Sequence, residues 1–174
     1  MNEAKLDTLI SEEAIRARLV ELGTEIREVY GDEPVTCIGI LKGSFMFMAD
    51  LVRTIGGEVR CEFLGVSSYH GGTRSSGVVK ITKDLQRPIE GHHCLIVEDI
   101  VDTGLTMQYL LQLLGVRSPK SLRVVTLLDK PGNREVDVPV DFVGFTIPDE
   151  FVVGYGLDLA ELYRNLPYIA VYTP

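Results

Sequence analysis

Carboxylates and hydroxyls are concentrated in one twelve-residue stretch, LIVEDIVDTGLT, from Leu95 to Thr106. Three apolar residues lead directly into the adjacent acids Glu98 and Asp99, and a third acid, Asp102, follows three positions later. An unpaired carboxylate at the end of a buried strand is costly. We therefore expect a cation, a metal ion or a set of hydroxyl groups to pair with these acids.

A tight turn follows the two adjacent acids and is expected to open a helix. Its residues are Asp102, Thr103, Gly104, Leu105 and Thr106. Free backbone N–H groups and the positive end of the helix dipole favour a phosphate at such a helix start, and threonine hydroxyls can add donors. The two adjacent carboxylates can accept hydrogen bonds from neighbouring sugar hydroxyls. Together with the phosphate-binding turn, they predict a pocket for a ribose 5-phosphate. For an isolated DTG, the alternative is an ordinary helix N-cap after a strand that ends in surface acids.

Other phosphate-handling motifs fail on spacing. The segment GYGLDL at 154–159 lacks the third glycine of a dinucleotide fingerprint, and the sequence contains no GxxxxGK[ST]. An aspartyl phosphatase requires two acids separated by one residue, whereas two residues separate Asp99 from Asp102. These classes of protein are therefore disfavoured.

The twelve-residue stretch as a whole resembles the phosphoribosyl diphosphate (PRPP) binding motif of type I phosphoribosyltransferases. Further segments extend the likeness: ILKGSFMFMADL, SSY, LLDK and FTIPDEFVVGYGLDLAELYRNLPYIAVY. They occur in order from about Val35 to Tyr172 and resemble the hypoxanthine-guanine phosphoribosyltransferases, with FVVGYGLD typical of the 6-oxopurine branch. The resemblance implies transfer of phosphoribosyl from PRPP to a purine, which yields a nucleoside 5-monophosphate and pyrophosphate in purine salvage.

The resemblance implies a role for each residue of the PRPP motif. Glu98 and Asp99 fix the ribose hydroxyls and, with Asp158, hold Mg²⁺, which offsets charge on the pyrophosphate leaving group. Asp102 is implied as the general acid/base at purine N7. The 5-phosphate is bound by Thr103, Gly104, Leu105 and Thr106. Some family members carry lysine where this chain has Leu105, so here the phosphate relies on backbone amides and hydroxyls.

Pyrophosphate contacts are implied for Lys42, Gly43 and Arg164. Lys42 and Gly43 lie where a buried strand breaks before a helix, so backbone N–H groups can point at a second anion. In the family this loop often contains a cis peptide, here between Leu41 and Lys42. Without the resemblance, the loop is an ordinary strand-to-helix turn, and Asp158 and Arg164 are solvated charges on a helix that begins near Asp158.

Purine contacts are implied for three residues. Lys130 bonds the 6-oxygen and thereby selects hypoxanthine, guanine or xanthine against adenine, while Phe151 stacks on the base and the Val152 backbone reads its edge. Ser68 and Tyr69 match the Ser-Tyr pair of the family's mobile catalytic loop, about 67–80, which closes to exclude water. Without the resemblance, Lys130 is a surface lysine, Phe151 a core or rim aromatic and the loop a solvated turn.

Strands and helices alternate along the chain and must position these residues. From Ser11, apolar residues at helical spacing predict a helix, with its inner face formed by Ile15, Leu19, Leu22, Ile26 and Val29. Further helices are expected at 45–55 and about 103–114. Strands are expected at 35–41, 59–69, 77–82, around LIVED, at 121–129 and around DFVGF, FVVGY and YIAVY.

This order predicts one α/β domain over 1–174, with a mostly parallel sheet flanked by helices and a ligand crevice at the carboxyl ends of the strands. The resemblance implies the type I phosphoribosyltransferase fold. In that fold we expect the hairpin 67–83 to form a small hood over the sheet.

Composition restricts the setting. The chain has 174 residues, 45% of them hydrophobic, and a formal net charge of -8, which disfavours a broad grip on nucleic acid or on an anionic membrane. Cys37, Cys61 and Cys94 form no CxxC pair and are expected to be small buried residues. No apolar run reaches the length of a membrane span. We expect a cytoplasmic protein whose partners are a purine base and PRPP.

Two alternatives differ in function. A xanthine-preferring enzyme would differ only in small features of the base pocket. A phosphoribosyltransferase-like regulator that binds RNA, as in pyrimidine-operon attenuators, would retain the PRPP loop, but the -8 charge and FVVGYGLD weigh against it. The resemblance also implies a homodimer or homotetramer, because members of the family usually form dimers or tetramers.

Overall fold

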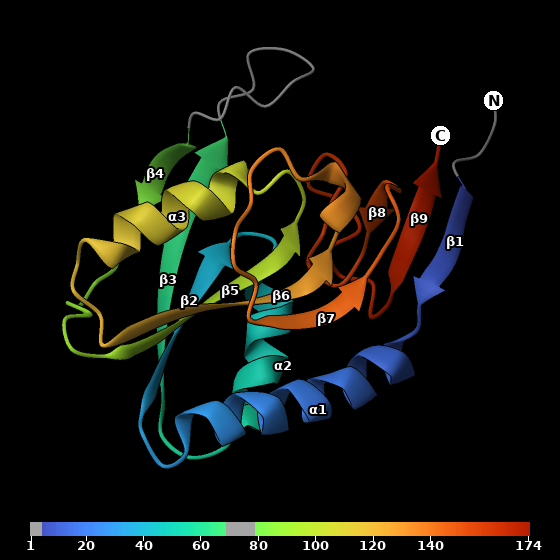
Figure 1. Ribbon diagram of the computed structural model, residues 1–174. Helices are drawn as coiled ribbons and strands as arrows, with labels where there is room; N and C mark the ends of the chain where they lie inside the picture. Colours follow the sequence, from blue (N-terminus) through green and yellow to red (C-terminus); the bar gives the residue numbers. More distant parts are fainter. Residues whose placement is uncertain (1–4, 69–78) are drawn as a thin grey trace.

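The computed structural model describes residues 5–68 and 79–174, which form two β-sheets with helices packed against the larger one (Figure 1). The strands of the larger sheet are β2 (Val35–Leu41), β3 (Val59–Ser68), β4 (Val79–Lys83), β5 (His93–Val101), β6 (Ser121–Asp129) and β7 (Phe142–Thr146). The helices are α1 (Glu12–Tyr30), α2 (Phe45–Ile55), α3 (Leu105–Gly115) and the short 3-10 helix η1 (Pro131–Asn133).

The larger sheet has the strand order β4-β3-β2-β5-β6-β7, and only β4, at one edge, runs antiparallel to its neighbour. Helices α1 and α2 cover one face and α3 covers the other (Figure 1). Successive residues of β2 follow this arrangement: Cys37 packs into the core cluster with α1 and α2, and Ile38 into the cluster with α3. The predicted type I fold, with a mostly parallel sheet between helices, is confirmed.

Helix α1 begins where its sequence predicts. The Ser11 hydroxyl caps it by accepting from the backbone N–H of Ala14 at 3.2 Å. The expected inner face is buried with one exception, because Val29 is 46% exposed. Tyr30, four residues after the fully buried Ile26, takes the inner position instead. The prediction for Val29 was therefore wrong by one position of the helical repeat.

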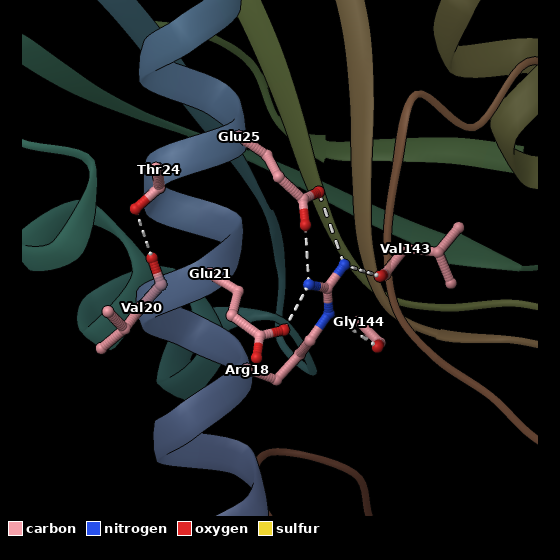
Figure 2. Close-up of polar contacts among 7 residues, drawn as sticks. All are labelled: Arg18, Val20, Glu21, Thr24, Glu25, Val143 and Gly144. Carbon is pink, nitrogen blue, oxygen red and sulfur yellow. Dashed lines mark hydrogen bonds and ion pairs between the residues drawn. The ribbon is translucent and has the colours of Figure 1, made fainter.

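Arg18 joins α1 to the edge strand β7 (Figure 2). Its Nε donates to the carbonyl of Gly144 at 3.1 Å and its Nη2 to that of Val143 at 2.9 Å. Its Nη1 donates to the carboxylates of Glu21 and Glu25, each at 2.7 Å. These bonds fix the guanidinium against two carbonyls of an edge strand, a position that otherwise offers free acceptors to another chain.

The smaller sheet is formed by β1 (Lys5–Ile10), β9 (Ile169–Thr173) and β8 (Val152–Val153), with β9 in the centre and antiparallel to both neighbours. It joins the first and last described strands of the chain (Figure 1). At the base of the hairpin 67–83, which is expected to form a small hood, β3 and β4 pair within the larger sheet, from Gly65 with Lys83 to Ser68 with Val79. The tip of that hairpin, 69–78, lies outside the described residues.

Two further observations concern the cysteines and the helices. Cys37 and Cys94 are buried as predicted, but Cys61 is exposed, near the amino end of β3. Among the helices of the described ranges, none combines the length and the apolar character that crossing a membrane requires.

Candidate active site

Strand β5 carries the two adjacent acids into the centre of the sheet. Leu95, Ile96 and Val97 are fully buried, and Glu98 is only 7% exposed. The strand does not end at the acids as expected but continues to Val101, with Ile100 and Val101 still paired to β6. The acids therefore lie within the carboxyl-terminal part of a strand that is held by neighbours on both sides.

Burial dominates the electrostatics of this acidic pair. The pKa of Glu98 is raised well above its usual range, first by loss of solvent and then by repulsion from Asp99. The pKa of Asp99 is also raised by burial, although Arg164 opposes the rise. Backbone N–H groups donate to both carboxylates, from Asp99 to Glu98 at 3.2 Å and from Ile100 to Asp99 at 2.8 Å. Within the described residues neither acid forms an ion pair, so the pair favours an incoming cation or hydroxyl donors.

The predicted phosphate loop lies directly after β5. Gly104 has a left-handed backbone with φ +88°, and a Cβ there would come within 2.8 Å of the Val136 carbonyl oxygen, so only glycine fits without strain. Helix α3 begins at Leu105 rather than at Thr103, and the Leu105 N–H points toward the Thr103 hydroxyl at 3.4 Å. The Asp102 Oδ1 is buried without a hydrogen-bond partner among the described residues.

A cavity of about 400 Å³ opens in front of this loop. It is lined by Glu98, Ile100, Val101, Asp102, Thr103, Gly104, Thr106 and Met107. The turn, the acid and the threonines that the sequence singled out thus surround one space.

Arg134 supports the predicted phosphate loop and was not found from the sequence. Its guanidinium donates to the carbonyls of Val101, at 2.9 Å, and Asp102, and it pairs with the Asp129 carboxylate at the end of β6. It thereby links the strand ends of β5 and β6. In the sequence, Arg134 could have been noticed from its position four residues after Lys130, just beyond the short helix η1.

The loop at Lys42 and Gly43 packs tightly against the acidic pair, and the peptide between Leu41 and Lys42 is cis. A Cβ on Gly43 would lie 2.6 Å from Cγ of Asp99 and would overlap its carboxylate oxygen. On the other side, a Cβ on Gly156 would lie 3.2 Å from the Gly43 carbonyl carbon and would overlap the carbonyl oxygen. The two glycines allow the loop to fit between β5 and the segment that follows β8.

Two cations from distant parts of the chain meet beside this loop. The ammonium of Lys42 pairs with Glu161 at 2.9 Å. Arg164 pairs with Asp158 at 2.7 Å, donates to the Gly156 carbonyl at 2.6 Å and approaches the second oxygen of Glu161 at 3.5 Å. The pKa of Glu161 is lowered, chiefly by its hydrogen bond from Lys42. Glu161, which the sequence reasoning missed, therefore contacts both predicted pyrophosphate ligands.

These charges surround a second cavity, of about 520 Å³. Its lining includes Lys42, Gly43, Glu98, Asp99, Thr106, Asp158, Glu161 and Arg164. Glu98, Ile100 and Thr106 line both cavities, so the two spaces adjoin. The alternative of a helix from about Asp158 was wrong: the segment consists of turns, with positive φ at Ala160, Glu161 and Tyr163.

The residues predicted to hold a purine lie beside the smaller sheet. Lys130 follows β6 and is 7% exposed rather than a surface lysine; its Nζ donates to the Glu150 carbonyl at 2.7 Å and lies 3.5 Å from Asp149. Phe151 is 52% exposed and packs edge-on against Tyr172, while Val152 is buried in β8.

The Lys130 bond connects the end of β6 to the segment that carries Phe151. Neither cavity is lined by Lys130 or Phe151 among the described residues. Ser68 is the last residue of β3, and Tyr69 lies outside the described residues.

Comparison with known proteins identifies the family of this chain. The sequence model of the phosphoribosyl transferase domain matches residues 7–160. A hypoxanthine-guanine phosphoribosyltransferase of Bacillus subtilis is 54% identical over 166 residues, which cover 95% of this chain and 92% of that protein. A hypoxanthine phosphoribosyltransferase of Haemophilus influenzae is 52% identical over 172 residues, covering 97% and 96%.

A solved structure extends the likeness from sequence to fold. The crystal structure of a hypoxanthine phosphoribosyltransferase from Staphylococcus aureus superposes with a TM-score of 0.93 at 51% identity, covering 97% of this chain and 91% of that one. The family model, the curated relatives and the solved structure all point to the same family. The chain belongs to the phosphoribosyltransferase family, within its hypoxanthine-guanine branch.

Proposed function

We propose that this protein transfers the phosphoribosyl group of PRPP to hypoxanthine or guanine, forming the nucleoside monophosphate and pyrophosphate. The observation that carries the proposal is the buried Glu98–Asp99 pair next to the start of α3. The pair occurs in a chain about half identical to hypoxanthine-guanine phosphoribosyltransferases over nearly its full length. The individual residue roles below are parts of the same proposal.

The ribose 5-phosphate is proposed to occupy the cavity at the start of α3. Its phosphate would accept hydrogen bonds from backbone N–H groups of Thr103 to Thr106 and from the two threonine hydroxyls. Leu105 contributes its backbone alone, which removes the charge that a lysine would supply. Glu98 and Asp99 would accept from the ribose hydroxyls. Among the described residues each accepts one backbone N–H and neither forms an ion pair, which supports this use.

The reaction breaks the bond from ribose C1 to pyrophosphate and forms the bond from C1 to purine N9. Positive charge develops on the sugar as the first bond breaks, and the two carboxylates beside it would stabilise that charge. Asp102 is proposed to take the proton from purine N7. The buried Oδ1 of Asp102, without a partner among the described residues, supports this role because it remains able to accept a proton.

Pyrophosphate is proposed to bind Lys42, Gly43 and Arg164 in the larger of the two cavities. The Lys42 ammonium and the Arg164 guanidinium line it, and the loop supplies a backbone N–H at Gly43. The carboxylate of Glu161 pairs with Lys42 at 2.9 Å and lies 3.5 Å from Arg164. Pyrophosphate must therefore displace Glu161 from Lys42 when it binds.

Mg²⁺ fits the donor set of this cavity. Glu98, Asp99 and Asp158 all line it and offer hard oxygen ligands, although no group of three acids in the described ranges is gathered closely enough to hold a metal alone. Mg²⁺ ordinarily takes one or two carboxylates and completes its shell with substrate oxygens and water. When bound, it would neutralise charge on the leaving pyrophosphate. Asp158 would have to share its oxygens with Arg164.

The purine is proposed to lie between Phe151 and the Lys130 ammonium. Of the three hydrogens on Lys130 Nζ, one is donated to the Glu150 carbonyl and one is directed toward Asp149. The third remains for the purine 6-oxygen, which adenine lacks. The exposed ring of Phe151 would stack on the base, and the Val152 backbone would read its edge.

Closure of the loop at Ser68 and Tyr69 over the substrates and assembly into homodimers or homotetramers are proposed on the family likeness alone. A cytoplasmic location is proposed from the three cysteines, which form no CxxC pair. A purine base and PRPP are the proposed small-molecule partners.

The decisive test is a magnesium-dependent assay with PRPP and one base per reaction: hypoxanthine, guanine, xanthine, adenine or uracil. Nucleotide and pyrophosphate are both quantified. Turnover of hypoxanthine and guanine, with none of adenine or uracil, supports the proposal. Preferential turnover of xanthine would replace the substrate assignment, and folded protein that binds PRPP without turning over any base would contradict the activity.

A further inference from the structure

A third cavity lies at the end of the sheet opposite the candidate active site. It measures about 340 Å³ and lies between the amino ends of β2 and β3 and the segment that leads into β5. Its lining includes Thr36, Arg60, Cys61, Phe63, Lys83 and Arg87. In register, Thr36 pairs with Arg60 on one side and Cys94 on the other, near the starts of the three parallel strands.

The distance from the active-site acids follows from strand geometry. Five residue steps separate His93, at the start of β5, from Glu98, which corresponds to about 16 Å along a parallel strand. The arrows of β2, β3 and β5 in Figure 1 point away from this amino-terminal edge. The cavity is therefore separate from the site proposed for PRPP and purine.

Unpaired positive charge distinguishes this cavity in a chain with a net charge of -8. Among the described lysines and arginines, those that form no ion pair are Arg27, Arg60, Lys80, Lys83 and Arg87. Three of the five, Arg60, Lys83 and Arg87, line this one cavity. The concentration of free cations at one place favours an anion.

Within the described residues, the acids near the cavity form no ion pair with its three cations. Glu62 is the only acid of the lining within the described residues, and its Oε2 accepts from the backbone N–H of Gln86 at 3.2 Å. Asp84, next to Lys83 in the chain, is held by two hydrogen bonds from Arg117, at 2.8 and 3.0 Å. The Lys83 ammonium donates to a neutral acceptor, the Phe63 carbonyl, at 3.2 Å. The cations thus retain capacity for an external acceptor.

The chemistry of the lining indicates the class of ligand. Two arginines present forked donors that match phosphate oxygens, and a lysine adds a point charge. The Thr36 hydroxyl and the His92 ring, whose Nδ1 lies 3.4 Å from it, can add hydrogen bonds. Phe63 and Ile89 provide apolar wall, and the volume falls in the range of small-molecule pockets. We propose that this cavity is a second binding site, for a small organic phosphate such as a nucleoside monophosphate.

Cys61 offers a reporter that the active site does not share. It lines the cavity and is exposed, whereas Cys37 and Cys94 are buried. A neutral thiol reagent should therefore modify native protein at Cys61 alone. A ligand in the cavity should slow this modification, and the site of labelling can be verified by peptide mass spectrometry.

The test measures the labelling rate of Cys61 in the intact protein with increasing guanosine monophosphate or inorganic phosphate. The variant Arg60→Ala/Arg87→Ala removes both guanidinium groups, and Lys5→Ala/Arg16→Ala removes two exposed charges elsewhere as a matched control. We expect saturable protection by guanosine monophosphate in the native chain and the control. In the test variant, the ligand concentration that halves the labelling rate should rise about tenfold for each charge-assisted hydrogen bond that is lost.

Transfer kinetics with PRPP and hypoxanthine should be the same in all three proteins, because the substituted residues lie away from the active-site cavities. Protection by inorganic phosphate as well would identify the phosphate group as the recognised element, and protection by the nucleotide alone would add its sugar and base. Labelling that neither compound slows, or protection that persists unchanged in Arg60→Ala/Arg87→Ala, would overturn the proposal.

Discussion

Gly43→Ala should damage both stability and catalysis through one steric conflict. The added Cβ would lie 2.6 Å from Cγ of Asp99, where ordinary contacts begin at 3.4 Å, and it would overlap the carboxylate oxygen, so the loop and the carboxylate must separate by roughly 1 Å or more. The carboxylate resists this movement because its Oδ1 accepts from the Ile100 N–H at 2.8 Å. The loop also cannot move away from Asp99, because Gly156 packs against the Gly43 carbonyl on the opposite side.

The expected magnitudes follow from this geometry. Overpacking of this kind costs about 1–3 kcal/mol in the free energy of unfolding. A displacement near 1 Å at the reacting groups lowers the specificity constant for PRPP by about a hundredfold. Urea denaturation and initial-rate kinetics with PRPP as the varied substrate measure the two effects.

Gly115→Ala is the matched control for this change. No atom lies within 4 Å of a Cβ at that position, at the end of α3, so stability and kinetics should stay at or slightly above the wild-type values. If Gly43→Ala matched wild type in both its urea midpoint and its kcat/KM for PRPP, the argument that this glycine permits close approach to Asp99 would fail.

Further predictions address single side chains. Asp102→Asn should retain PRPP binding but lose about two or more orders of magnitude in turnover, the usual span for a lost proton-transfer group; unchanged kcat would remove it from that role. Burial raises the pKa of Glu98 in the folded protein above its unfolded value, which is near 4.5. The free energy of unfolding should therefore fall as the pH rises from about 4.5 through the folded pKa, because the buried carboxyl must then ionise. Glu98→Gln should flatten this decline in urea midpoints measured across pH, and an equal decline in the variant would contradict the assignment. Glu161→Gln frees Lys42 and should tighten pyrophosphate binding about two- to fivefold by calorimetry, whereas Glu33→Gln, which breaks an exposed pair elsewhere, should not.

Local pattern was sufficient for the elements with one strong signal. The apolar run at 35–41 and the helical run at 45–55 match β2 and α2 residue for residue, because hydrophobic continuity and a following glycine act within the segment itself. The acidic stretch likewise predicted a ligand crevice, since a buried strand that carries carboxylates is too costly without a function.

The sequence did not predict the pairing of strands that are far apart along the chain. The N-terminal strand β1 has mostly exposed side chains and no apolar alternation; it is a strand because β9, more than 150 residues later, supplies its hydrogen-bond partners. The turns after Asp158 carry positive φ at three non-glycine residues, which tertiary contacts impose against local preference.

For the candidate site, the sequence by itself determined which residue types are present and that the acids, the turn and the small residues follow one another in a strand-to-helix unit. Only the tertiary structure decided that Glu161 reaches Lys42 across 119 positions, that Arg134 donates to the carbonyl of Val101 before the predicted phosphate loop and that Lys130 is buried. Each of these depends on side chains from separate elements meeting at one edge of the sheet. Such meetings are set by packing, not by the spacing of residues along the chain.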